Sequence, residues 1–486
     1  MKKYNIPLTC TGILACMSYQ SPAAPAKTPN IVIIFMDDMG YGDLTITGAL
    51  GYKTPNIDQL AHEGVLCTHF YVAQPISSAS RAGLLTGCYS NRIGLGGAAL
   101  SPQSNVGISD KEMTIAELLK QKNYTCGIFG KWHLGDRQQF LPLQHGFDEY
   151  LGLPYSNDML PMEYDGTVIP PNSTSRKASY PPLPLIDGNE KVKELRTLED
   201  MSQLTTLYTE RAVSFIRKNK KKPFFLYVPH SMPHVPLAVS SKFKGKSELG
   251  MYGDVMMEID WSVGQIMATL KELKLDKNTL VIFTSDNGPW INFGEHAGST
   301  AGMREAKATS WEGGQRLPCI MRWKGVIKEG QICNQLISAI DIFPMIASIC
   351  DAPLPSHPID GVNIWPLISG ATETSPRTHF LYYFNANNLK AVSNWRWKLV
   401  FPHTYNSYEN QMPGKDGLPG TISTKTVKEP ELYDLRRDPG ERYNVIDLYP
   451  DVVAELMKVA DEARMDLGDD LTGHKGTGRR PVGKVN

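Results

Sequence analysis

The sequence predicts an α/β fold in which helices sandwich a large, mainly parallel or mixed sheet, with a smaller C-terminal α+β subdomain of antiparallel strands and a helix. Three observations carry this prediction. Apolar runs rich in β-branched residues recur as far as about residue 372, and each reads as a strand buried on both faces. Amphipathic segments with helical spacing alternate with them. Beyond that point the runs become short and alternating, which is typical of an antiparallel sheet.

The length of the chain suggests several domains, and its charge restricts the kinds of partner it can bind. The chain has 486 residues, and its 50 basic and 50 acidic residues cancel. Such a balance gives no electrostatic reason to expect a nucleic-acid partner. We divide the chain into an export signal and linker (1–28), a large α/β domain (29–372) and a C-terminal α+β subdomain (373–486).

The first residues have the pattern of an export signal: two lysines, an apolar run to residue 16, then small residues and prolines up to Pro29. Two processing routes compete. The sequence ILAC resembles a bacterial lipobox and would make Cys16 a lipidated first residue, whereas Ala24-Pro25-Ala26 is the small-residue alternative. We favour the lipobox, which predicts a lipoprotein in the periplasm or on the outer membrane of a Gram-negative bacterium. No later run reaches the roughly 20 apolar residues of a spanning helix.

Six cysteines follow residue 16, and they show neither CxxC pairs nor a Cys/His zinc pattern. We expect buried free thiols, because a hydrophobic core of this size is stable without disulfide bonds. A disulfide between Cys333 and Cys350 is the alternative.

The first predicted strand, 30–36, ends in Asp37-Asp38. Two adjacent carboxylates at a strand end repel each other and need a cation or several donors nearby. A capped helix over 54–64 and a short strand over 68–72 follow. Next comes the serine-rich stretch 77–80, in which Ser80 is the expected N-cap of a helix whose positive end faces residue 77.

The middle of the chain repeats the alternation of helix and strand. A helix over 111–122 precedes a strand over 124–129, which leads to Lys131 and His133. Side chains two apart can face one pocket. A second pair, the helix 204–218 and the strand 224–228, leads into a proline-rich loop that contains His230 and His234, and the prolines restrict its backbone.

The last pair of this kind is a helix over 256–270 and a strand over 279–284, which ends at Asp286-Asn287 and precedes Lys307. Ligands of such sheets bind beyond the carboxyl ends of the strands, which is where these polar residues lie. Three aspartates and an asparagine offer hard oxygen ligands without thiolates, a set that favours Ca²⁺ over Mg²⁺ and over zinc. We place the C-terminal strands at 380–384, 390–392, 395–401 and 431–435 and a helix at 452–467.

Residues 77–81 (SSASR) and 84–87 (LLTG) closely resemble the signature of the formylglycine-dependent sulfatases, within the alkaline phosphatase superfamily. The resemblance extends from about residue 30 to the segment 431–435, and it implies an alkaline phosphatase-like fold. In this family the first residue of the signature is oxidised to formylglycine, here Ser77. Ser stands where Cys is commoner and Ala79 where Pro is usual, so Ser77 is either a native substrate of an anaerobic bacterial maturase or a replacement of Cys that traps ligands.

The resemblance also implies roles for the residues at the strand ends. Formylglycine hydrate would attack sulfur with one hydroxyl and expel sulfate through the other. His133 would take a proton from the hydrate, and His234 or Lys307 would protonate the departing alcohol. Arg81 would bind the formylglycine hydroxyl and the carboxylates, and Lys131 would contact the sulfate together with His133, His234 and Lys307. The ligands of Ca²⁺ would be Asp37, Asp38, Ser77, Asp286 and Asn287.

Three further motifs, 130–135 (GKWHLG), 145–149 (HGFDE) and 153–156 (LPYS), are similar to the branch that contains arylsulfatase A and the galactosamine-6-sulfatases. They imply that the substrate is a sulfated oligosaccharide of host glycans such as mucin or glycosaminoglycan. The favoured target is 6-O-sulfated galactose or N-acetylgalactosamine. Candidate sugar contacts are Asn157, Asp158 and His296.

Two other functions remain open at this point. A phosphatase or phosphodiesterase of the same superfamily would need a second metal site, for which the sequence offers no obvious ligands. A non-catalytic binder of sulfated glycans would result if Ser77 stayed unmodified.

Overall fold

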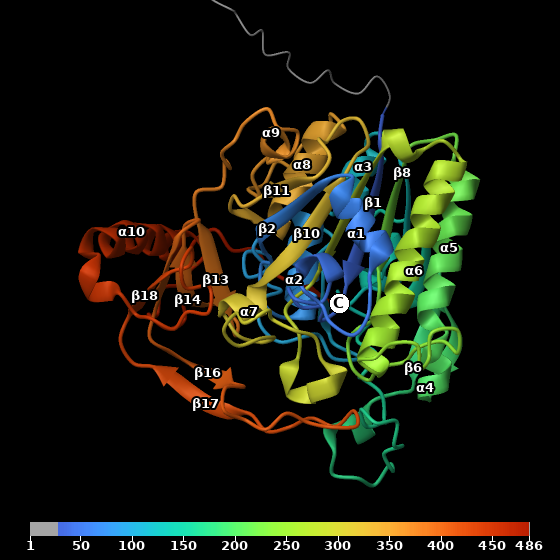
Figure 1. The fold of residues 1–486 in the computed structure, drawn as a ribbon, viewed down its shortest axis with the longest axis horizontal. Helices are drawn as coiled ribbons and strands as arrows, with labels where there is room; N and C mark the ends of the chain where they lie inside the picture. Colours follow the sequence, from blue (N-terminus) through green and yellow to red (C-terminus); the bar gives the residue numbers. More distant parts are fainter. Residues whose placement is uncertain (1–27, 486) are drawn as a thin grey trace, which may run out of the picture.

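The computed structural model describes residues 28–485, and the processing sites at Cys16 and at residues 24–26 lie outside that range. Its centre is a mixed 11-stranded sheet with the order β11-β2-β10-β9-β1-β8-β4-β5-β6-β7 and with β12 beside β2 (Figure 1). The strands that position the site are β1 (Asn30–Met36), β4 (Thr125–Lys131), β8 (Phe224–Pro229) and β9 (Thr279–Ser285). Around them lie β2 (Val65–Tyr71), β5 (Glu149–Leu153), β6 (Leu183–Asp187), β7 (Glu190–Leu195), β10 (Arg316–Arg322), β11 (Gln331–Cys333) and β12 (Ile337–Ser338).

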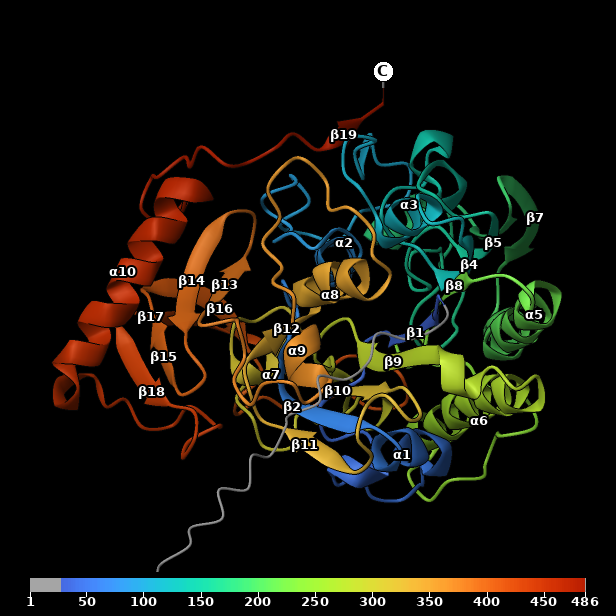
Figure 2. The same ribbon diagram turned by 90° about the horizontal axis from the view of Figure 1, so that it is seen from above.

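Helices cover both faces of this sheet, and the two groups separate clearly in Figure 2. One face carries α1 (Pro55–His62), α5 (Leu204–Asn219) and α6 (Met251–Glu272), which share a buried cluster with Val32 and Ile34 of β1. The opposite face carries α2 (Ser77–Thr86), α3 (Ile115–Lys120) and α8 (Ile342–Ile349), which pack on Ile31 and Ile33. Alternate residues of β1 therefore enter two different cores, which explains why this strand is apolar at every position.

Parallel pairing of the central strands aligns their carboxyl ends. β1 pairs in parallel with β8 on one side and with β9 on the other, and β4 pairs in parallel with β8. The register places Phe35 opposite Pro229 and Met36 opposite Ser285, so the loops that follow these strands leave the sheet side by side. The polar residues predicted at these strand ends therefore lie along a single edge.

The C-terminal part forms its own four-stranded antiparallel sheet, covered by a helix. The order β13-β14-β15-β18 uses the strands Phe380–Phe384, Asn388–Ser393, Trp397–Val400 and Glu431–Asp434, and the helix is α10 (Pro450–Asp466). A separate hairpin of β16 (His403–Ser407) and β17 (Ser423–Val427) extends beneath the main sheet in Figure 1. The predicted fold class is thus confirmed, with a mixed main sheet and an antiparallel C-terminal subdomain.

The beginning of α2 differs from the prediction. Ile76, in extended conformation, is the N-cap, and Ser80 lies one turn inside the helix, where its backbone N–H donates to the Ile76 carbonyl oxygen at 3.0 Å. The expected N-cap role of Ser80 was therefore wrong, because the N-cap of the helix lies four residues earlier, at Ile76. As a result Ser77 is the first residue of α2 rather than a neighbour of its end.

The C-terminal tail, the cysteines and the helix lengths complete the description of the fold. β19 (Gly483–Lys484) pairs with β3 (Val106–Gly107), so the tail returns to the catalytic part of the chain. All six cysteines of the described range are free thiols, as expected, and the alternative disulfide between Cys333 and Cys350 is not formed. Among the described residues, none of the helices has both the length and the apolarity that crossing a membrane requires.

Candidate active site

Four oxygen-bearing side chains meet where β1 and β9 end. The Asp38 backbone N–H donates to Asp286 Oδ1 at 3.1 Å, and Asn287 Nδ2 donates to Asp38 Oδ1 at 2.7 Å. Asp38 adopts a positive φ of 63°, which turns the chain sharply so that consecutive carboxylates can face one centre. Asp37, Asp286 and Asn287 are fully buried. The sequence motif at each strand end thus contributes to a single cluster.

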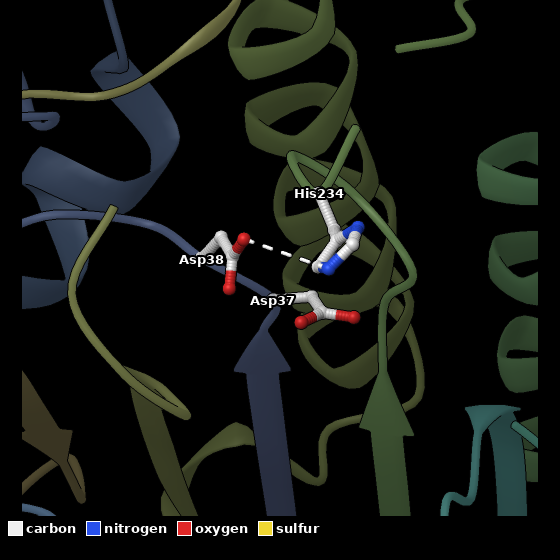
Figure 3. A group of neighbouring side chains, drawn as sticks. All are labelled: Asp37, Asp38 and His234. Carbon is white, nitrogen blue, oxygen red and sulfur yellow. Dashed lines mark ion pairs between the residues drawn. The ribbon is translucent and has the colours of Figure 1, made fainter. Parts of the chain in front are cut away.

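This cluster fits a hard divalent cation. Asn287 Oδ1 is buried without a hydrogen-bond partner, so it is an oxygen ligand that nothing in the described chain satisfies. Carboxylate oxygens of Asp37 and Asp38 and a ring nitrogen of His234 lie within 4.8 Å of one another, and Figure 3 shows these side chains around the end of β1. Within residues 28–485 no other group of three His, Cys, Asp or Glu side chains is arranged in this way.

Ser77 lies beside this cluster at the start of α2. Its Oγ donates to Asp37 Oδ1 at 3.1 Å and accepts from Lys131 Nζ at 3.4 Å, and the side chain is almost fully buried. Arg81, one turn further along α2, binds Asp286 at 2.9 Å and lies 3.4 Å from Asp37. The guanidinium therefore contacts the carboxylates, and its NH1 donates to the Lys131 carbonyl oxygen at 3.0 Å.

Two lysines each pair with one of the two adjacent carboxylates. Lys131, at the end of β4, pairs with Asp37 and donates to Ser156 Oγ at 3.1 Å. Lys307 pairs with Asp38 at 2.8 Å, and its Nζ lies 4.6 Å from the centre of the Trp290 ring. Both ammonium groups are buried or nearly so, which makes them strong donors to an anion that enters the site.

The two histidines differ in which nitrogen is free. His133 Nε2 lies 3.0 Å from the Leu100 carbonyl oxygen, so this nitrogen carries the proton and the buried Nδ1 is left as an acceptor without a partner. In His234 the Nδ1 is bonded to the Val235 carbonyl oxygen, and Nε2 lies 3.6 Å from Asp38. Each backbone carbonyl thus fixes a tautomer and leaves the other ring nitrogen for chemistry.

Burial and neighbouring charges shift the pKa values of several groups in the site. Burial, reinforced by the negative charge of Asp37, raises the pKa of Asp286 to about 7. Burial also opposes ionisation of Asp37, but Lys131, His234 and Arg81 together hold its pKa well below the usual value. Burial and the charge of Lys131 lower the pKa of His133, which keeps its ring neutral. For Lys307 the carboxylates of Asp38 and Asp37 outweigh burial and raise the pKa.

A pocket of about 230 Å³ opens onto these groups. Its inner end is formed by Ser77, His133, Ser156, His234 and Lys307, and its outer walls come from several separate segments. The outer lining residues are Ile76, Ala99, Asp158, Met159, Trp290, Ala308, Asn406, Tyr408 and Ile422. The pocket therefore leads from the protein surface to Ser77.

The structure brings together every residue that was proposed from the sequence for metal, nucleophile and sulfate. The candidate sugar contacts divide: Asp158 lines the pocket, whereas Asn157 donates its amide to the His234 and Pro236 carbonyl oxygens, both at 3.2 Å. His296 ends the 3-10 helix Ile291–His296 and does not line the pocket.

Sequence reasoning missed several residues of the pocket. Ser156 follows β5, and the strand-end rule could have found it, but β5 was not predicted. Asn406, Tyr408 and Ile422 lie between the predicted strands 395–401 and 431–435, where we placed no helix or strand, although the alternation of His403–Ser407 carried a weak strand signal.

Comparison with known proteins agrees with this geometry. The family model described as "Sulfatase" matches residues 29–352, and the model described as "C-terminal region of aryl-sulfatase" matches residues 375–477. The mouse (Mus musculus) N-acetylgalactosamine-6-sulfatase is 37% identical, covering 94% of this chain and 89% of that protein. The bovine (Bos taurus) arylsulfatase A is 36% identical, covering 91% and 88%.

A solved structure gives the same result for the fold. The PsFucS1 sulfatase from Pseudoalteromonas sp. superposes with a TM-score of 0.80 at 27% identity, covering 94% of this chain and 92% of that one. The two family models together account for most of the described residues, including every strand end that contributes to the site. We conclude that the chain belongs to the sulfatase family and is a sulfuric ester hydrolase.

Proposed function

We propose that this sulfatase removes sulfate from carbohydrates, with 6-O-sulfated galactose or N-acetylgalactosamine as the favoured target, through formylglycine at position 77 and with Ca²⁺. One observation carries the proposal: Ser77 lies in a buried pocket against both Asp37 and Lys131, between the carboxylate cluster and the cationic side chains. An anionic ester that enters this pocket meets Lys307 in its lining, and its sulfur would come to lie next to residue 77, which Lys131 contacts from within the protein.

The cation would be held by Asp37, Asp38, Asp286, Asn287 and residue 77. The unsatisfied Asn287 Oδ1 and the three carboxylates supply oxygen ligands only, which suits Ca²⁺ better than Mg²⁺ because flexible carboxylates tolerate its variable geometry. When bound, such an ion would neutralise part of the sulfate charge and polarise an S–O bond. Arg81, which already binds Asp286 and approaches Asp37, keeps these carboxylates in place.

We infer formylglycine rather than a permanent serine at position 77 because turnover needs two hydroxyl groups. Formylglycine, as its hydrate, would supply two hydroxyls, one to attack and one to release sulfate, whereas a serine could be sulfated only once. The chain's own contribution is orientation: α2 fixes the backbone of residue 77, and Asp37 and Lys131 contact the side-chain oxygen from different directions.

Proton transfer falls to the two histidines and Lys307. Neutral His133, with a free Nδ1, accepts a proton from the hydroxyl on residue 77. Lys307, whose raised pKa keeps it charged, or His234 beside it, gives a proton to the departing alcohol oxygen. Lys131 remains with Asp37 and binds the sulfate oxygens.

The substrate class is inferred from the relatives. Two proteins that are 36–37% identical over nine-tenths of this chain are named as an N-acetylgalactosamine-6-sulfatase and an arylsulfatase A. The motif at residues 153–156 belongs to the same site, because Ser156 binds Lys131. A phosphatase or phosphodiesterase is less well supported, since the described residues contain one group of potential metal ligands rather than two.

The division into residues 1–28, 29–372 and 373–486 stays part of this proposal, and so do export, a lipid at Cys16 and a maturase that oxidises residue 77. A non-catalytic glycan binder is the outcome if residue 77 remains serine. Mass spectrometry of the fragment that contains residue 77, after co-expression with an anaerobic maturase, distinguishes the two. Loss of two hydrogens from the serine marks formylglycine.

Activity is tested with the matured protein on 3-, 4- and 6-sulfated galactose, galactosamine and glucosamine, with nitrophenyl phosphate alongside. We expect the 6-sulfated galacto sugars to be hydrolysed fastest. The Ser77→Ala variant should be inactive, whereas Ser80→Ala, one turn along the same helix and without a hydrogen-bond partner for its hydroxyl, should keep its activity. Faster hydrolysis of the phosphate than of any sulfate would refute the proposal.

A further inference from the structure

The outer half of the active-site pocket has a lining distinct from the sulfate-binding residues. Asp158 and Met159 contribute one wall, Trp290 a second, and Asn406 and Ile422 a third. These residues come from three distant parts of the chain, and the last two belong to the β16–β17 hairpin. The alcohol half of a sulfate ester bound next to Ser77 must occupy this space.

Among the residues that the structure describes, Asp158 is the only carboxylate that lines this pocket. Its Oδ2 accepts a hydrogen bond from the Tyr164 hydroxyl at 3.3 Å, while Oδ1 is buried and accepts none of normal geometry from the described residues. Burial alone would raise the pKa of Asp158, but the electrostatic influence of His234, the Ser156 hydroxyl and the charge of Lys177 hold it below the usual value. Asp158 is therefore a charged carboxylate that can accept further hydrogen bonds, in a pocket whose other charged groups attract anions.

Trp290 offers a rigid apolar surface in the same pocket as this carboxylate. Its ring packs against Phe293 and Tyr164 at centroid distances of 4.9 and 6.0 Å, and His234 lies 5.9 Å away. Fixed aromatic rings provide a large contact area at small entropic cost. A flat or ring-shaped alcohol can rest on this surface while its polar edge faces Asp158.

The hairpin closes the pocket on the remaining side. Its loop is tied to the main domain because the backbone N–H groups of Gly414 and Gly420 both donate to the Asn292 carbonyl oxygen at 2.7 Å. The Asp416 N–H binds Glu295 Oε1 at 2.9 Å. These bonds hold Ile422, which is 47% exposed, at the mouth of the pocket, so the hairpin forms a fixed wall.

We propose that Asp158, Trp290 and the β16–β17 hairpin form a subsite for one sugar ring at the end of a chain, a ring with no charge other than the reacting sulfate, and that Asp158 accepts hydrogen bonds from its free hydroxyls. The assignment deepens the proposed function and rests on it. The pocket of about 230 Å³ is smaller than the roughly 300–1,000 Å³ of sites that enclose drug-sized ligands, so it has room for a single ring with its sulfate. The charge of Asp158 repels a carboxylate or a second sulfate on that ring.

The subsite can be tested by binding, independently of turnover, in the form of the protein that keeps serine at position 77. Calorimetry would compare two probes, 6-sulfated N-acetylgalactosamine and nitrophenyl sulfate, which share the sulfate but differ in hydroxyl groups. The variant is Asp158→Asn. The matched control is Asp165→Asn, an exposed aspartate in the same loop whose side chain accepts only from a local turn.

We expect Asp158→Asn to weaken binding of the sugar about 10- to 100-fold, the range for a hydrogen bond to a charged group, and to weaken binding of nitrophenyl sulfate much less. The control should bind both probes as the wild type does. A 4,6-disulfated sugar should bind the wild type at least about 10-fold more weakly than the monosulfated one, and Asp158→Asn should narrow that gap.

Equal weakening of both probes would overturn the inference, because Asp158 would then act through His234 and the sulfate end. Failure of the wild type to bind the sulfated sugar would overturn it as well. The proposed function is judged separately, by hydrolysis with the matured protein. If the matured protein hydrolyses the ester but Asp158→Asn affects both probes equally, only the subsite is refuted. If Asp158→Asn weakens binding of the sugar selectively but the matured protein hydrolyses no sulfate ester, only the hydrolase mechanism is refuted.

Discussion

The hydroxyl of Tyr408 donates a hydrogen bond to the backbone oxygen of Lys307 at 2.8 Å, so a residue next to the C-terminal hairpin supports a lysine of the sulfate site. The Tyr408 N–H and the Ser407 hydroxyl both bind the Glu305 carboxylate, two residues before that lysine. The C-terminal subdomain is therefore part of the catalytic architecture rather than an independent appendage.

We predict that Tyr408→Phe lowers kcat/KM for a sulfate ester about 3- to 10-fold, because Lys307 loses a support worth roughly 1 kcal/mol. Steady-state kinetics on the matured protein would measure it. Tyr443→Phe is the control, since Tyr443 is 71% exposed. An unchanged kcat/KM in Tyr408→Phe would show that the backbone holds Lys307 without this contact.

A buried ion cluster joins the two parts of the chain. Lys398 Nζ lies 3.2 Å from Glu312 and 2.7 Å from Glu441, and all three side chains are inaccessible to solvent. Lys398→Met would leave buried carboxylates without their cation, and we expect it to lower the free energy of unfolding by about 3–5 kcal/mol. Urea titration would test this. Arg396→Met, which removes a partly exposed pair with Asp434, should cost less than about 1 kcal/mol.

Calcium should stabilise the folded protein. At a Ca²⁺ concentration of about 100 times Kd, the gain in the free energy of unfolding is about 2.7 kcal/mol, and a chelator should reverse it. Thermal melts of Asn287→Ala should show a much smaller calcium-dependent shift, because an oxygen ligand is lost. Asn172→Ala, an exposed substitution, should behave as the wild type. An equal shift in all three proteins would place the ion elsewhere.

Acid should destabilise the protein partly through His230. Burial lowers the pKa of His230 to about 4 from 6.5, so below pH 6.5 the unfolded chain binds a proton that the native state refuses. Stability therefore falls as the pH decreases from 6.5 towards 4, by up to about 3 kcal/mol for this residue. Unfolding titrations at several pH values should show a shallower decline in His230→Asn, and parallel declines would contradict the assignment.

The sequence predicted the parts of this site that follow long apolar strands. β1, β8 and β9 carry long apolar runs and β4 is buried at all but its first position, because both faces of these strands are covered by helices, and the polar residues at their ends stand out. β5 is short, and β7 is largely exposed, so neither shows that pattern and Ser156 was missed. In the β16–β17 hairpin, buried and exposed residues alternate along β16, and the hairpin forms a small sheet of its own. Its position at the pocket depends on contacts with Asn292 and Glu295, which the sequence does not reveal.

The pairing of β19 with β3 has a consequence for the timing of events during synthesis. Residues 106–107 acquire their strand partner only when residues 483–484 have left the ribosome, and Arg480 completes an ion pair with Glu112 at 2.7 Å just as late. Residue 77, 2% exposed in the finished structure, is enclosed by strands and loops that are made long after it. The modification that we propose for position 77 would therefore require a nascent or unfolded chain as its substrate.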